Sequence, residues 1–140
     1  MRASRLSLLL ALPLLLWGCN AQNQAETKTE EVAAVTPEEI RSLVMEEIHA
    51  VNDTIALPNP KTGENVSLVY SGVHQGVMMT PGGRQMVCVD FAASDSTMFD
   101  VDYYLSKRDA QWFVTDVVVH KVGDEDFLTE VDRTRLGDVQ

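Results

Sequence analysis

Cysteine and basic residues are both scarce in this chain. Its 140 residues include two cysteines, Cys19 and Cys88, so no metal motif built from paired cysteines is present. Lys and Arg number 11 against 21 Asp and Glu, which gives a net charge of −10. Such a chain repels phosphate backbones, and it contains neither a glycine-rich phosphate loop nor a nucleophile elbow. We therefore expect no nucleic-acid partner.

Long apolar runs are also lacking, apart from one near the start of the chain. Residues 6–17 form a predominantly apolar stretch that follows the basic residues Arg2 and Arg5. As a helix this stretch covers about 18 Å, well short of the ~30 Å hydrocarbon core of a bilayer. Pro13 disfavours a helix there still further. A short apolar segment behind positive charges predicts an export signal and not a permanent membrane span.

The end of this segment carries a recognisable motif, Leu16-Trp17-Gly18-Cys19. It resembles the lipobox of bacterial lipoprotein precursors. The resemblance implies cleavage before Cys19, a diacylglycerol on its thiol and further acyl groups at the new amino terminus. Several acyl chains on one cysteine make release from a membrane negligible. Asn20 is not the aspartate that the resemblance associates with inner-membrane retention, so an outer membrane is favoured where two membranes exist.

Four segments follow from this interpretation. Residues 1–18 are the lipoprotein signal peptide, 19–35 a flexible tether without aromatic residues, 36–122 a folded domain, and 123–140 an acidic tail. The tail either forms one short docking helix or stays loose. Removing the leader leaves 9 Lys and Arg against 21 Asp and Glu, a net charge of −12. Because anionic lipid headgroups repel that charge, attachment must come from the lipid on Cys19.

The folded domain opens with a helix signal. Thr36, Pro37 and Glu39 form an N-terminal capping box with proline in the first turn. Apolar residues then recur at helical spacing over residues 40–51, and Glu47 intrudes on their face. The pattern predicts an amphipathic helix over 37–51.

Everything after residue 60 has the alternation of strands. Extended patterns at 66–79, 84–91, 98–105 and 111–122 are separated by short turns, and Gly72 marks either a turn or a bulge in the first of them. We expect an α+β fold in which an N-terminal amphipathic helix packs on one face of a four- to five-stranded antiparallel β-meander. In outline this resembles the cystatin-like or NTF2-like arrangement.

One predicted face of the sheet is acidic. Registers estimated from the turns place His74 opposite Asp90, Asp90 opposite Asp100, and Asp100 opposite Asp116. A single row then contains His74, Asp90, Asp100 and Asp116, with Asp102 one step along. Carboxylates opposite one another destabilise a sheet, so this row needs an explanation.

Three explanations remain open at this point. The row is a site for a divalent cation, which suits carboxylates with one imidazole. Alternatively it is an acid–base site, with Asp90 or Asp100 as acid or base and His74 as partner. The third explanation is an ordinary solvated outer face, which antiparallel sheets commonly have.

Other residues are assigned no chemical role by their pattern. Cys88 is expected to be a small buried hydrophobe, because nothing places a base beside it. His49 and His120 have no evident partner. Trp112 beside Tyr104 is either a cross-strand aromatic pair or the rim of a binding surface, and we expect the pair.

The sequence as a whole favours a lipid-anchored module on the cell membrane or outer membrane, facing the periplasm or the exterior. We expect a non-catalytic binding or accessory module that contacts an envelope protein or a small ligand. The covalent diacylglycerol and acyl groups on Cys19 are its only required additions, and a divalent cation is the candidate ligand of the acidic row. The rival hypotheses are an enzyme using that row, and an inhibitor or assembly factor for an envelope protein.

Overall fold

The computed structural model describes residues 34–138. The predicted signal peptide, Cys19 and the tether up to residue 33 lie outside the described residues. The elements in chain order are α1 (Pro37–Ala50), β1 (Thr54–Pro58), β2 (Asn65–Met79), β3 (Gln85–Ala93), β4 (Met98–Arg108), β5 (Gln111–Val122), β6 (Glu125–Asp126) and α2 (Glu130–Leu136). Over these residues, no helix combines the length and apolar character needed to cross a membrane.

The predicted fold class was wrong. The strands form one six-stranded antiparallel sheet in the order β1-β2-β3-β4-β5-β6, and two short helices accompany it in place of one. The first helix begins only at Pro37, so it is not N-terminal in the chain. The five residues of β1 were missed because a turn signal at Asn52-Asp53 precedes them and the last of them, Pro58, is itself a turn signal. β6 has only two residues, too few to show an alternation.

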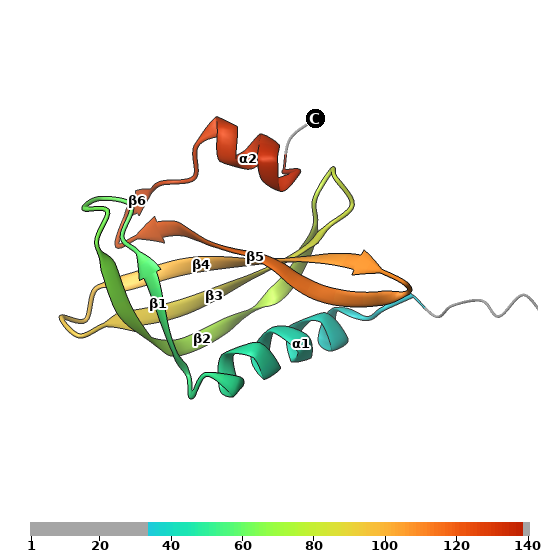
Figure 1. Ribbon diagram of the computed structural model, residues 1–140, viewed down its shortest axis with the longest axis horizontal. Helices are drawn as coiled ribbons and strands as arrows, with labels where there is room; N and C mark the ends of the chain where they lie inside the picture. The colour runs from blue at the N-terminus through green and yellow to red at the C-terminus, as the bar shows by residue number, and fades with distance from the viewer. Residues whose placement is uncertain (1–33, 139–140) are drawn as a thin grey trace, which may run out of the picture. The chain divides into compact units, whose positions relative to one another are not determined.

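Helix α1 has the local structure that its sequence predicts. The Thr36 side chain accepts a hydrogen bond from the Glu39 backbone N–H, and the Glu39 carboxylate accepts one from the Thr36 N–H at 2.7 Å. Its buried stripe consists of Ile40, Val44 and Ile48, each at most 1 % exposed. This stripe packs on one face of the sheet, against β2, β3 and β5 (Figure 1).

The face of the sheet under α1 is the larger core. We call it the α1-side core. Its buried members on the strands are apolar residues at alternate positions, and they pack against the stripe of α1. On the strands they are Leu68, Val87, Val89, Phe91, Phe99, Val101, Tyr103, Leu105 and Val122. At about 25 cal/mol per Å² of apolar surface, this burial is the main force holding the helix to the sheet.

The opposite face is covered by the C-terminal segment. Figure 1 shows α2 on the other side of the sheet from α1. Met86, Tyr104, Leu128 and Leu136 are all buried there, and we call this cluster the α2-side core. A helix of seven residues is too short to persist by itself in water, so α2 depends on this packing. The acidic tail therefore buries the central part of the sheet face that was expected to carry the acidic row.

The β4–β5 hairpin decides what lies on that second face. Its turn consists of Asp109 and Ala110, both with positive φ, as a two-residue hairpin loop of type I′ requires. Register shifts between β4 and β5 then leave Thr115 and His120 as extra residues on β5. The turn position and the two bulges together set Asp100 opposite Lys121 and not opposite Asp116.

The first of these bulges also moves an aromatic residue. Trp112 pairs with Lys107 and packs against the α1-side core, as does Val114. The expected cross-strand pair of Trp112 with Tyr104 was therefore wrong. Tyr104 is instead opposite Asp116 and donates a hydrogen bond of 2.6 Å from its hydroxyl to Asp138, beyond the end of α2.

Candidate metal centre

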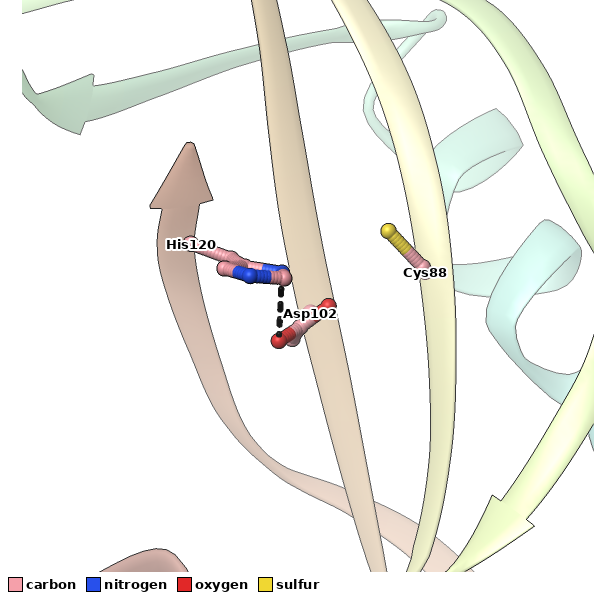
Figure 2. Close-up of side chains that lie close together, drawn as sticks. All are labelled: Cys88, Asp102 and His120. Atoms are coloured by element: carbon pink, nitrogen blue, oxygen red, sulfur yellow. Dashed lines mark ion pairs between the residues drawn. The ribbon is translucent and has the colours of Figure 1, made fainter. Parts of the chain in front are cut away.

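Three potential metal ligands meet on the second face of the sheet. Cys88 on β3, Asp102 on β4 and His120 on β5 lie on consecutive strands, and one donor atom of each lies within 4.8 Å of the others. Cys88 and Asp102 are directly opposite in the β3–β4 ladder. His120 reaches them because it is the extra residue of the second β5 bulge. Figure 2 shows Asp102 between the other two side chains.

Asp102 is the central and most buried of the three. The residue is only 1 % exposed, and its Oδ2 lies 3.4 Å from Nδ1 of His120. Its Oδ1 is buried and has no hydrogen-bond partner among residues 34–138. Leaving a carboxylate oxygen unsatisfied inside a protein is costly, so a structure rarely keeps one without a role for it. A bound cation would satisfy this oxygen.

The Cys88 thiol is strongly held in its protonated form. Burial raises its pKa to about 12, and the charges of Asp102, Asp100 and Asp90 add to the shift. A thiol with such a pKa is a poor nucleophile, because the reactive species is the thiolate. A metal ion reverses this situation, since coordination deprotonates a thiol outright. The environment of Cys88 therefore argues against a catalytic nucleophile.

His120 interacts with carboxylates on both sides of its ring. Its pairing with Asp102 raises the pKa of His120 and outweighs burial, which would lower it, and Asp126 raises it further. Nε2 lies 3.5 Å from Oδ2 of Asp126 on β6. His120 therefore contacts both Asp102 in the interior of the sheet and Asp126 in the C-terminal segment.

The donor set matches a divalent transition metal. Thiolate, carboxylate and imidazole are the three protein ligand types of Zn²⁺. A deprotonated Cys88 and an ionised Asp102 would together neutralise two positive charges, which a buried ion requires. Asp102 and His120 also line a pocket of about 230 Å³ whose wall includes Met86 and Arg133.

Part of the predicted acidic row is present but lies elsewhere on the sheet. Asp90 is opposite Asp100, as predicted. The predicted placement of His74 opposite Asp90 was wrong, because Gly72 is opposite Asp90 and His74 falls in a register shift of β2. The His74 side chain still reaches Asp90, with Nε2 3.1 Å from its Oδ1. The His74 and Asp90 side chains are 48 % and 33 % exposed, so water solvates this pair. Asp100 has Lys121 as its opposite neighbour on β5.

Asp116 does not belong to the row. It forms ion pairs with Arg84 and, at 3.1 Å, with Arg135 of α2. Burial by itself would raise the pKa of Asp116, but the hydrogen bonds and charges of the two arginines outweigh it and hold the pKa below its usual value. The predicted placement of Asp116 opposite Asp100 was wrong, because the β4–β5 turn and two bulges shift β5 along β4.

Two members of the candidate site were given no chemical role from the sequence. One signal for Cys88 was available: the turn that sets Asp90 opposite Asp100 also sets Cys88 opposite Asp102. His120 shares a predicted strand face with Asp116, but the sequence has no sign of the bulge that turns it toward Asp102.

Comparison of the chain with protein-family models, with curated proteins and with solved structures finds no match.

Proposed function

We propose that this chain is the precursor of a cell-envelope lipoprotein, anchored through Cys19, whose folded module binds a divalent transition-metal ion. Cys88, Asp102 and His120 are the ligands. The observation that carries the proposal is the buried Oδ1 of Asp102, which lacks a partner among the described residues and lies beside a thiol and an imidazole. The motif Leu16-Trp17-Gly18-Cys19 behind a short apolar segment supports the anchor.

Cobalt is a suitable probe of the metal site, because Co²⁺ takes zinc sites and a thiolate bound to it gives a charge-transfer band in the near ultraviolet. Titrating the full-length purified protein should produce this band, and Cys88→Ser should abolish it. His49→Ala is the matched control, since His49 lies on α1, 58 % exposed and paired with Asp53. Cobalt affinity equal to that of the parent in Cys88→Ser would refute the site.

The anchor is tested by cell fractionation. Cys19→Ser should move the protein from the membrane to the soluble fraction, because the acyl chains supply the attachment. Cys88→Ser, which alters the other cysteine, should leave the protein on the membrane. Mass spectrometry of the mature amino terminus gives an independent readout, and an unmodified Cys19 would contradict lipidation.

A further inference from the structure

The two ring nitrogens of His120 each face a different carboxylate. Nδ1 lies 3.4 Å from Asp102 inside the sheet, and Nε2 lies 3.5 Å from Asp126 at its edge. Only one nitrogen of an imidazole can bind an ion at this site. A histidine that binds a metal almost always donates its other ring N–H to a carboxylate, a carbonyl or water, which fixes the tautomer and the ring orientation.

Resting on the metal site proposed above, we propose that Asp126 is the positioning residue of His120. Nδ1 is the nitrogen on the side of Cys88 and Asp102, so it is the ligand, and the Nε2–H donates to Asp126. The assignment leaves Asp126 outside the coordination sphere, where its oxygen orients the ring. Its exposure of 52 % fits this outer place.

Asp126 is itself held by the C-terminal segment. Its Oδ1 accepts a hydrogen bond of 2.9 Å from the backbone N–H of Leu128, and its Oδ2 lies 3.2 Å from Nη2 of Arg133 on α2. Leu128 and Leu136 are buried in the α2-side core. Docking of α2 therefore places the partner of His120, and metal binding should in turn stabilise the docked helix, because such coupling is reciprocal.

Cobalt affinities of two substitutions at the same position test the role of Asp126. Asp126→Ala removes the acceptor and should weaken Co²⁺ binding by the full-length protein about ten- to a hundredfold. Asp126→Asn keeps an acceptor oxygen and should retain most of the parent's affinity. The matched control is Asp124→Ala, which removes an exposed carboxylate two residues away and should have no effect.

Each other outcome overturns a distinct part. Parent-like affinity in Asp126→Ala, with binding still lost in Cys88→Ser, overturns the positioning role and leaves the metal site intact. Equal losses in Asp126→Ala and Asp126→Asn overturn hydrogen-bond acceptance as the role of Asp126 and assign the effect to its negative charge. Failure of the parent to bind cobalt overturns the proposed function and this inference with it.

Amide hydrogen exchange tests the coupling separately from affinity. Saturating Co²⁺ should slow exchange of the α2 amides in the parent, because the ion favours the state in which Asp126 is in place. The same addition should leave α2 exchange unchanged in Asp126→Ala. Exchange of α2 that does not respond to the ion in the parent would overturn the coupling.

Discussion

Leu136→Ala is a direct test of how the C-terminal helix is held. Leu136 is 0 % exposed and is the only residue of α2 that is buried. Its side chain packs with Met86, Tyr104 and Leu128, and its backbone oxygen accepts a hydrogen bond of 3.3 Å from Arg84. The substitution removes the apolar contact and leaves the backbone acceptor in place.

The structure limits how far Leu136→Ala can lower the free energy of unfolding. Replacing a buried leucine by alanine costs about 2 to 5 kcal/mol in protein cores. However, α2 can detach from the sheet while the α1-side core stays folded. Once α2 is detached, Leu136 makes no buried contact, so the substitution cannot lower the free energy of unfolding any further. We therefore expect about 2 kcal/mol, the low end of that range.

Urea unfolding of the full-length protein measures this free energy of unfolding, and hydrogen exchange of α2 reports the local opening. Val131→Ala is the matched control, because Val131 lies on the same helix and is 76 % exposed. It should change stability little, since it removes no buried contact. A Leu136→Ala protein as stable as Val131→Ala, with equal α2 exchange, would refute the docking of α2 on the sheet.

Three further substitutions have definite expected results. Because the pKa of Asp116 is lowered in the folded protein, its ion pairs contribute their full stability above about pH 4 and lose it as the pH falls through that pKa. Asp116→Asn lacks this contribution, so its free energy of unfolding should fall less below about pH 4 than that of the parent in an acid titration. Ala110→Gly should raise the free energy of unfolding by about 0.5 to 1 kcal/mol, because relief of left-handed strain at φ 68° exceeds the entropic cost of glycine; an unchanged urea midpoint would contradict this. Gly137→Ala should speed amide exchange in α2, because Gly137 has φ 81° and an added Cβ would lie 3.2 Å from Cα of Gly82; parent-like exchange would show that the turn tolerates a side chain.

Local patterns were predictable where neighbouring residues supply the physics. The structure confirms the capping box of Thr36 and Glu39. The predicted stripe was Ile40, Leu43, Val44, Ile48 and Val51: the first, third and fourth are buried and Leu43 is half-buried, but Val51 lies beyond the helix and is 47 % exposed. The pairing of Asp90 with Asp100 was also predictable, because a short turn with no bulge joins their strands. In each case a few consecutive residues fix the geometry.

The number of strands and the second helix were not predictable in the same way. β1 has five residues and is stabilised by pairing with β2, which a local pattern does not show. Helix α2 is stable because Leu128 and Leu136 pack against Met86 and Tyr104 on the sheet. These elements depend on contacts between segments far apart in the chain.

The sequence by itself determined the first helix, the alternation of the central strands and the acidic character of the chain, because each follows from residues close together. Only the tertiary structure decided which side chains meet. Because of two bulges on β5, His120 lies beside Asp102 and Asp116 pairs with Arg84. Helix α2 then covers this face of the sheet at the α2-side core. A one-residue shift in a strand depends on the packing of the whole sheet, and no local pattern of residues reports it.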